Sequence, residues 1–314
     1  MTMKSGRTRR LLAAMPMVVA LAAGSAACGG GGGDGAAQAG ADGKISVVSS
    51  TNVWGSVVRA VGGVHVQVNS LVEDPSADPH SYQASAEDAA DVQSAQLLVY
   101  NGGGYDDFFA QLADQAPDAE PVVAVEGEPG HEEHAGEHEH GHDHGNEHVW
   151  YDLHIVGEVA DKVANRLGRI DPEHRQTFTR NAQAFQDKLT ELENTIERIP
   201  AGRVIATEPV AHYLLEAAGV ADATPREFSQ AIENETDVPV AAQQEVMALV
   251  SGKRIDAVVN NPQTMTPVTE KLVGAARGAG VPVVDVTETL PEGTTDYIAW
   301  MGSQIESLAG ALGK

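Results

Sequence analysis

Short apolar runs alternate with amphipathic stretches along most of the chain after Lys44. The runs are rich in β-branched residues and end in polar ones, which is typical of buried strands, whereas the stretches between them repeat apolar residues at helical spacing. One such stretch begins with Ser85, which we expect to cap a helix over residues 85–95. The first half of the chain contains four predicted strands, at residues 45–51, 64–72, 96–102 and 121–125.

A long amphipathic segment separates this half from a second half with the same rhythm. Asp171 and Pro172 predict the start of a helix, and the 28 residues from Pro172 to Ile199 would span about 42 Å. Strands separated by helices predict an α/β fold with mainly parallel sheets. We therefore expect two lobes of four strands each, joined by a helix at residues 171–200. The second half contains a last amphipathic helix, DYIAWMGSQIESLAGALG, and four predicted strands, at residues 203–208, 222–229, 256–261 and 281–287.

The N-terminus has the three parts of a secretory signal peptide: a basic start, a short apolar core and small residues before the cut. Cys28, the single cysteine, stands where a bacterial lipoprotein carries its acylated cysteine, and a glycine run follows it. We expect residues 1–27 to be removed and residues 28–43 to form a tether from a lipid anchor on Cys28. The alternative is a secreted protein. The two lobes then comprise residues 44–170 and residues 201–314.

The chain is strongly acidic, with a formal net charge of −25. Removal of the signal peptide would take away four basic residues and no acidic ones, which leaves a charge of −29. Such a surface argues against nucleic acid or an anionic membrane face as a partner, and it suits a cation.

A histidine-rich, acidic segment at about residues 126–147 interrupts the α/β pattern. Seven histidines fall within residues 131–148, a density that indicates contact with metal rather than a plain solvated loop. Imidazole clusters bind Zn²⁺, Cu²⁺ or Ni²⁺ better than Mn²⁺. The last histidine, His148, differs from the others because the apolar phrase VWYDL follows it. We expect the remaining six to collect metal on a loop, namely His131, His134, His138, His140, His142 and His144.

Four polar phrases contain side chains that could bind a metal: DPHSY (78–82), EHVWYD (147–152), TEPVAHY (207–213) and VTETLPEG (286–293). Ligands of open α/β sheets bind beyond the carboxyl ends of the strands. Two imidazoles and two carboxylates at such an edge would suit Zn²⁺ or Mn²⁺ and not Ca²⁺. Each residue alone also has a plainer interpretation, as a solvated loop histidine or as a carboxylate that caps a helix. The candidates are His80, His148, Glu208 and Glu288.

The order of these phrases resembles the zinc/manganese receptors of bacterial ABC importers, the TroA-like solute-binding family. The resemblance extends from about Lys44 to the end of the chain and also includes VYNGGG and NNPQTMTP. It implies two α/β lobes linked by one long rigid helix, with the metal ion held by His80, His148, Glu208 and Glu288. His212 is an outside candidate in place of Glu208. We expect a monomer anchored at the outer side of the cell membrane, with a membrane permease as its partner.

The ligand set and the loop resemble different branches of that family. Two histidines with two glutamates resemble the manganese members, whereas a histidine-rich loop resembles the zinc members. Zn²⁺ also accepts carboxylate oxygens, and we favour zinc over manganese. A metal buffer or adhesin that acts through the loop without a transporter is a further interpretation. We expect no enzyme, because four protein ligands would leave no position for a catalytic water and no HExxH stretch occurs.

Overall fold

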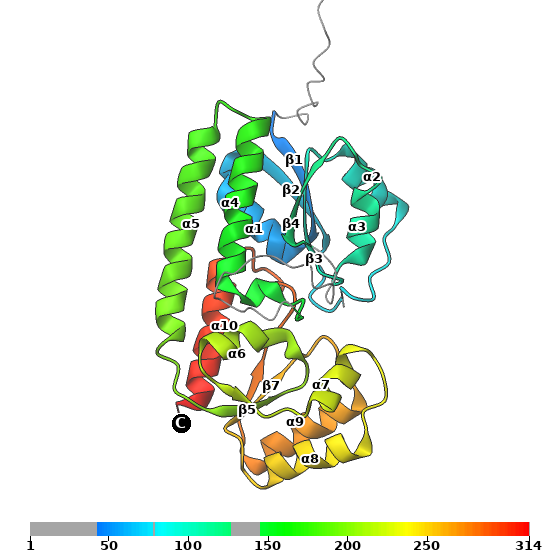
Figure 1. Ribbon diagram of the computed structural model, residues 1–314, viewed down its shortest axis with the longest axis vertical. Coiled ribbons are helices and arrows are strands. Elements are labelled where there is room, and N and C mark those ends of the chain that lie inside the picture. The colour runs from blue at the N-terminus through cyan, green and yellow to red at the C-terminus, as the bar shows by residue number, and fades with distance from the viewer. Residues whose placement is uncertain (1–42, 78, 127–144, 314) are drawn as a thin grey trace, which may run out of the picture. The chain divides into compact units, whose positions relative to one another are not determined.

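The structure, a computed structural model, describes residues 43–77, 79–126 and 145–313. These residues form two separate parallel sheets of four strands, each flanked by helices (Figure 1), which confirms the predicted α/β fold class. The predicted signal peptide, Cys28 with its tether and the six loop histidines from His131 to His144 lie outside the described residues. Among the helices of the described ranges, none is long and apolar enough to cross a membrane.

The first half of the chain forms the first sheet and its helices. Its elements are β1 (Ile45–Thr51), α1 (Asn52–Gly62), η1 (Gly63–His65), β2 (Val66–Val72), α2 (Ala86–Ser94), β3 (Leu97–Gly102), α3 (Asp107–Ala113) and β4 (Glu120–Val125). The strand order is β2-β1-β3-β4. Val47 and Leu97 point into a large core, whereas their neighbours Val48 and Leu98 point into a smaller core beneath α2 and α3. Both faces of the sheet are therefore covered, which explains the continuous apolar runs of the sequence.

The loop between β2 and α2 is held at both ends. At its start, the Asp74 carboxylate accepts hydrogen bonds from the backbone N–H and the hydroxyl of Ser76, at 2.8 and 2.7 Å. At its end, Ser85 caps α2 as predicted: its hydroxyl accepts from the N–H of Asp88 at 3.1 Å, and the Asp88 carboxylate accepts from the N–H of Ser85 at 2.7 Å. These contacts restrain the segment that contains His80.

Two long helices lie side by side after the histidine-rich segment, α4 (Leu153–Ile170) and α5 (Arg175–Ile196) (Figure 1). The predicted start of the second helix at Pro172 is wrong. Asp171 accepts the N–H of His174 at 3.3 Å with both its carbonyl and its carboxylate, and this turn reverses the chain before α5 begins. The helix has 22 residues, or about 33 Å, and it leads from the first half of the molecule to the second sheet.

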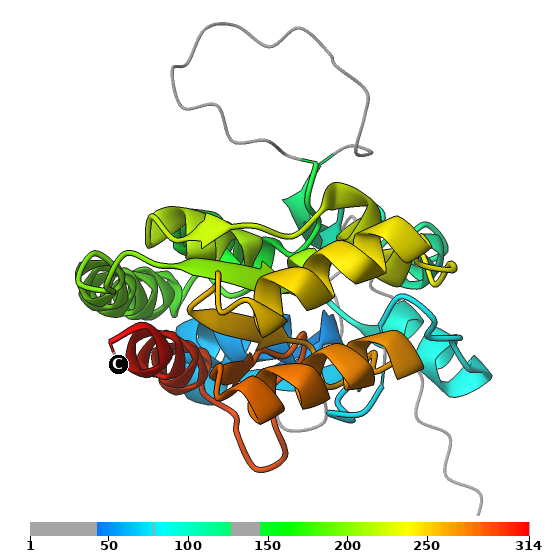
Figure 2. The ribbon, with the colours of Figure 1, turned by 90° about the horizontal axis from the view of Figure 1, so that it is seen from below.

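The second sheet has the strand order β6-β5-β7-β8. The predicted strand at 222–229 is wrong beyond Asp222, because Phe228 and Ile232 are buried at helical spacing on a helix that follows Pro225. Figure 2 shows the yellow α8 and the orange α9 side by side over this sheet. The elements are β5 (Arg203–Ala206), η3 (Pro209–Ala211), α6 (His212–Ala217), β6 (Ala221–Asp222), α7 (Arg226–Glu233), α8 (Val240–Ser251), β7 (Ala257–Asn260), α9 (Pro267–Ala279), β8 (Val283–Asp285) and α10 (Tyr297–Leu312).

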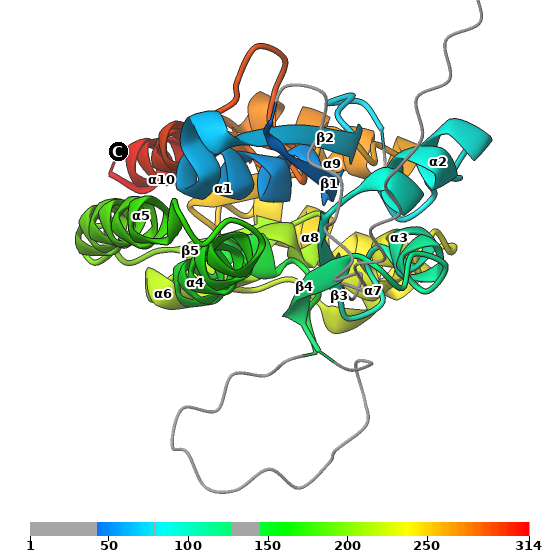
Figure 3. The same cartoon turned by 90° about the horizontal axis from the view of Figure 1, so that it is seen from above.

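The largest core is continuous from one sheet to the other. It contains Trp54 and Trp150 from the first half and Val284 and Tyr297 from the second. The last helix, α10, packs against α1 and α5, as the red helix beside them shows in Figure 3. The Tyr297 hydroxyl, inside this core, donates to the backbone carbonyl of Trp150 at 2.7 Å. The two halves are thus joined by shared apolar packing as well as by α5.

Candidate metal centre

His80 lies in the loop beyond the carboxyl end of β2, where its ring faces two carboxylates. Nε2 lies 3.6 Å from Oε2 of Glu288, and Nδ1 lies 3.6 Å from Oε1 of Glu147. The edge of the ring packs against Tyr105, with the ring centroids 4.8 Å apart. The side chain is 28% exposed, so one part of the ring is reachable from solvent.

His148 is buried, and its ring is oriented by Asn146. The Asn146 Oδ1 accepts hydrogen bonds from the backbone N–H of His148 at 2.9 Å and from its Nδ1 at 2.8 Å. Because the proton is then on Nδ1, Nε2 presents a lone pair. This atom is buried and has no hydrogen-bond partner among the residues that the structure describes. Burial, reinforced by the charges of nearby His80 and His212, lowers the pKa of His148 well below its usual range. The ring is therefore neutral at pH 7, as a metal ligand must be.

The segment around His148 is fastened on both sides. After it, Val149 and Trp150 are buried in the large core, within the short helix η2 (Val149–Tyr151). Before it, Asn146 donates to the carbonyl of Pro209 at 2.8 Å and accepts, at its own carbonyl, from the Tyr213 hydroxyl at 2.7 Å. These partners belong to the second half, so both halves fix the position of one imidazole.

The NGGGYD segment at the end of β3, residues 101–106, positions Glu147 and Tyr105 beside the site. The Asp106 carboxylate accepts from the backbone N–H groups of Asn101 and Gly102, at 2.7 and 2.8 Å. Asn101 in turn donates from its amide to the carbonyl of Glu147 at 2.9 Å. Gly102 has a φ of 72°, and a Cβ there would lie 2.4 Å from the carbonyl oxygen of Val125, so a glycine is required. The turn that follows brings Tyr105 to the metal centre.

Glu288 is 1% exposed and accepts hydrogen bonds with both of its oxygens. Tyr105 donates its hydroxyl to Oε2 at 3.1 Å, and Asn261 donates to Oε1 at 2.7 Å. The backbone N–H of Glu288 donates to the Gln263 side chain at 2.6 Å. Burial and the adjacent Glu288 charge raise the pKa of Tyr105 well above its usual range, so the phenol keeps its proton and donates. Burial and these hydrogen bonds thus fix the orientation of the Glu288 carboxylate.

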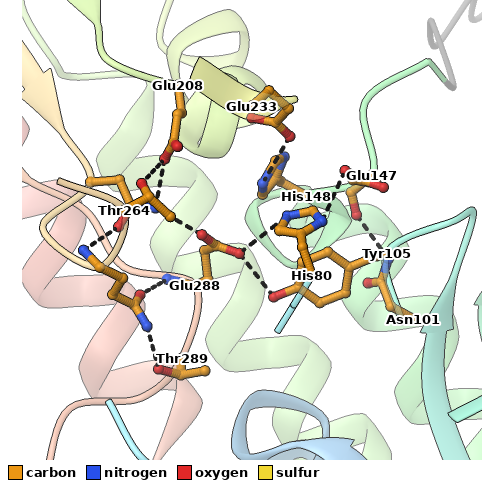
Figure 4. A network of polar contacts seen from close by, with 12 residues as sticks. His80, Asn101, Tyr105, Glu147, His148, Glu208, Glu233, Thr264, Glu288 and Thr289 are labelled. Atoms are coloured by element: carbon orange, nitrogen blue, oxygen red, sulfur yellow. Dashed lines mark hydrogen bonds and ion pairs between the residues drawn. The ribbon is translucent and has the colours of Figure 1, made fainter. Parts of the chain in front are cut away.

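Three of the four predicted ligands lie close together in the structure. His80, His148 and Glu288 each offer one ligand atom, and these atoms all lie within 4.8 Å of one another (Figure 4). Ligands of a tetrahedral zinc ion, at bond lengths of about 2.1 Å, are separated by about 3.4 Å. The 3.6 Å between His80 and Glu288 is close to that value. Two imidazoles and a carboxylate therefore converge at one point between the two sheets.

Glu208, the fourth predicted ligand, lies beside this group rather than in it. Its Oε2 accepts from the Asn261 amide at 2.7 Å and from the Thr264 hydroxyl at 2.6 Å. The same Asn261 nitrogen bonds Glu288, so one amide bridges the two carboxylates. Within the described ranges, Glu208 is in none of the groups whose ligand atoms lie within 4.8 Å of one another. It nevertheless lines the same cavity as His80 and Glu288.

Two further carboxylates, Glu147 and Glu233, reach the site and were not among the predicted ligands. Together with His80 they form a second group of ligand atoms within 4.8 Å, and Oε1 of Glu233 lies 3.6 Å from Nε2 of His148. Burial and the charges of Glu208, Glu147 and Glu288 raise the pKa of Glu233 to about 9. The position of Glu147 next to His148 was a usable signal in the sequence. Glu233 offered none, because it lies at the end of helix α7, whose first half had been predicted as a strand.

The other histidines considered from the sequence lie elsewhere. His212 begins α6, is 42% exposed and lies 4.0 Å from Glu216, so the structure does not place it with the ligand group. His154 is an exposed residue of α4 that pairs with Glu158 at 3.3 Å. His65 and His174 form a separate cluster with Asp171 at the turn between α4 and α5.

The donor set fits a borderline divalent cation. A cavity of about 740 Å³ lies at the site, lined by residues that include His80, Glu208, Glu233 and Glu288. Neutral imidazole with carboxylate suits Zn²⁺ and Mn²⁺, whereas Ca²⁺ prefers oxygen ligands alone. Glu147, Glu208 and Glu288 bring further carboxylate oxygens to the cavity or its rim, and a divalent ion would offset their negative charge.

Comparisons with known proteins identify metal-binding relatives of this chain. The family model "ZnuA: Zinc-uptake complex component A periplasmic" matches residues 47–311. The chain is 26% identical over 233 residues to the manganese-binding lipoprotein MntA of Bacillus subtilis, which covers 71% of this chain and 72% of MntA. It is 23% identical over 294 residues to the zinc-binding protein TroA of Treponema pallidum, over 89% of this chain and 92% of TroA.

A comparison with solved structures finds proteins of similar fold. The solved structure of the periplasmic zinc-binding protein TroA of Treponema pallidum is similar, with a TM-score of 0.68 at 21% identity. The similarity covers 86% of this chain and 99% of TroA. Since the family model matches most of the sequence, the chain belongs to the ZnuA family, the TroA-like metal-binding receptors of ABC importers.

Proposed function

We propose that this protein is an extracytoplasmic receptor that captures Zn²⁺ between its two lobes and delivers it to the permease of an ABC importer. The observation that carries the proposal is the buried Nε2 of His148. It has a lone pair and a fixed orientation, and no hydrogen-bond partner within the described part of the chain. A buried polar atom without a partner is costly, and a metal ion in the adjacent cavity would supply one.

The ligands of the bound ion are His80, His148 and Glu288 in this proposal, with Glu208 as the fourth. Glu208 becomes a ligand when its carboxylate turns from Thr264 toward the ion. Tyr105, Asn146 and Asn261 do not bind metal. They orient the ligands through hydrogen bonds, as partners of metal ligands commonly do.

Zinc is favoured over manganese by the two imidazoles at the site and by the histidines of residues 131–144. Imidazole-rich sites bind Zn²⁺ more strongly than Mn²⁺. Manganese is the second candidate, because four carboxylates surround the two rings, a larger number than the sequence predicted. The curated relatives include both a zinc-binding and a manganese-binding protein.

The histidine-rich segment acts in this proposal as an auxiliary collector. His131, His134, His138, His140, His142 and His144 bind zinc weakly and exchange it quickly, which raises the local concentration of the ion near the cavity. Lipid attachment at Cys28 would hold the receptor at the cell membrane, next to its permease.

The test compares His148→Ala with His154→Ala, which removes an exposed histidine of α4 as the matched control. The two variants and the parent protein are titrated with Zn²⁺ and with Mn²⁺ by competition against a chelator. We expect His148→Ala to lose the tight site and to fail to support growth in chelated medium, whereas His154→Ala behaves like the parent. Tight zinc binding that survives in His148→Ala would overturn the proposal and point to a loop-based buffer. Tighter binding of Mn²⁺ than of Zn²⁺ by the parent would make it a manganese receptor.

A further inference from the structure

The two ring nitrogens of His80 face two different groups of ligands. Nε2 faces Glu288, at 3.6 Å, and Nδ1 faces Glu147, also at 3.6 Å. Figure 4 shows the ring between the two carboxylates. On the Nε2 side, Glu288 and His148 complete a group that we call the inner position. On the Nδ1 side, Glu147 and Glu233 complete a group that we call the outer position.

The two positions differ in their access to solvent. The side chains of His148 and Glu288 are each 1% exposed, whereas those of Glu147 and Glu233 are 20% and 18% exposed. His80, at 28%, is the most exposed of the five and belongs to both positions. An ion that comes from solvent therefore meets the ligands of the outer position before those of the inner one.

The outer carboxylates lie together with one imidazole. One oxygen of Glu147, one oxygen of Glu233 and a ring nitrogen of His80 lie within 4.8 Å of one another. Glu147 pairs with the imidazole of His80, and Glu233 pairs with the imidazole of His148. Two carboxyl groups and an imidazole brought together in this way offer oxygen and nitrogen ligands that suit a borderline divalent cation.

We propose that His80, Glu147 and Glu233 form a transient outer position through which the metal ion passes on its way into and out of the inner position. This inference rests on the proposed function of the cavity. The ion first replaces solvent with Glu147, Glu233 and Nδ1 of His80. Glu233, 3.6 Å from Nε2 of His148, then carries the ion to that atom, and Nε2 of His80, which already faces the inner position, replaces Nδ1. At each step one protein ligand replaces another, so the ion is never stripped of ligands.

A transient position of this kind has a kinetic signature. Because Glu147 and Glu233 lower the barrier between the free and the bound ion without contacting the ion in its final state, they speed association and dissociation by the same factor and leave Kd unchanged. A permanent ligand behaves differently, since its loss raises the dissociation rate and weakens Kd.

The experiment measures zinc association and dissociation by stopped-flow tryptophan fluorescence on the full chain. Trp150 reports arrival at the inner position, because its ring lies 5.2 Å from that of His148. Glu147→Gln retains the size of the side chain and removes its charge. We expect this variant to slow both rates by roughly tenfold and to change Kd by less than about threefold. Glu235→Gln is the matched control, because it removes an exposed charge from the lining of the same cavity. It should leave both rates unchanged.

Three results would overturn the inference. If Glu147→Gln weakens Kd through faster dissociation, Glu147 is a permanent ligand. If Glu235→Gln slows association as much as Glu147→Gln does, the effect is general attraction of the ion by negative charge. Unchanged rates in Glu147→Gln would show that the ion does not pass through the outer position. In all three cases the proposed function still stands if His148→Ala abolishes tight binding, so the two proposals fail separately.

Discussion

The Asn146 Oδ1 lies 2.8 Å from Nδ1 of His148 and thereby determines which ring nitrogen faces the cavity. The same oxygen accepts the backbone N–H of His148, which identifies it as the amide oxygen and the imidazole as the donor. Asn146 is itself held by Pro209 and Tyr213 of the second half. The orientation of a ligand from one half is thus set through contacts with the other.

Replacement of Asn146 should weaken metal binding without removing a ligand. In Asn146→Ala the His148 ring loses its orienting acceptor, and we expect the Kd for Zn²⁺ to rise by about 10- to 100-fold. Competition against a fluorescent chelator measures the change. Asn194→Ala, which removes an exposed amide of α5, is the control and should bind like the parent. Equal affinities for the two variants would show that Asn146 does not orient the ligand.

Replacement of Asn261 should destabilise the metal-free protein, because its amide nitrogen donates hydrogen bonds to both Glu208 and Glu288. Asn261→Ala removes this donor and should lower the free energy of unfolding of the metal-free protein by about 1–3 kcal/mol. Asn261→Asp places a third carboxylate between the two and should be less stable than Asn261→Ala at pH 7. Urea unfolding in the presence of a chelator compares them. The difference should shrink near pH 4, where carboxylates take up protons, and a difference that is independent of pH would argue against repulsion as its cause.

Asp106 should make the stability depend on pH. Burial raises the pKa of Asp106 to about 6, although hydrogen bonds from the Asn101 and Gly102 backbone oppose the shift. The folded state therefore binds more protons than the unfolded state between about pH 4 and pH 6. The contribution of this group to the free energy of unfolding falls as pH rises through that window, by roughly 3 kcal/mol, and is constant above it.

Asp106→Asn should therefore flatten the pH dependence of unfolding over that window. Denaturant unfolding of the metal-free protein from pH 4 to pH 8 measures the slope. The exposed neighbour provides the control, since Asp107→Asn should keep the slope of the parent. Parallel curves for Asp106→Asn and the parent would mean that the carboxyl titrates near its ordinary pKa.

Deletion of residues 131–145 should distinguish the weak metal sites of the histidine-rich segment from the tight site in the cavity. The inner ligands His80, His148 and Glu288 remain, so calorimetry with Zn²⁺ should show one tight site and the loss of the weaker ones. Binding should weaken toward pH 6 in the deleted protein, because protons compete with the ion for imidazole. Loss of the tight site on deletion would place the segment within it.

Much of the fold was predictable because it depends on local spacing. The strands at 45–51 and 96–102 were found within one residue of their observed bounds, and the Ser85 cap was also correct. The errors occurred where a turn or a tertiary contact overrides the local pattern. Asp171 starts a turn instead of a helix. Phe228 lies on a helix, although the short apolar segment around it had been predicted as a strand.

By itself, the sequence determined the α/β architecture and the four candidates His80, His148, Glu208 and Glu288, since strand periodicity and short polar phrases are properties of neighbouring residues. Only the tertiary structure decided how these candidates are used. Asn261 keeps Glu208 beside the group, and the end of α7 brings Glu233 to His148. The physical reason is that distances between side chains on separate elements depend on how both halves pack around their common core, and no spacing along the chain encodes those distances.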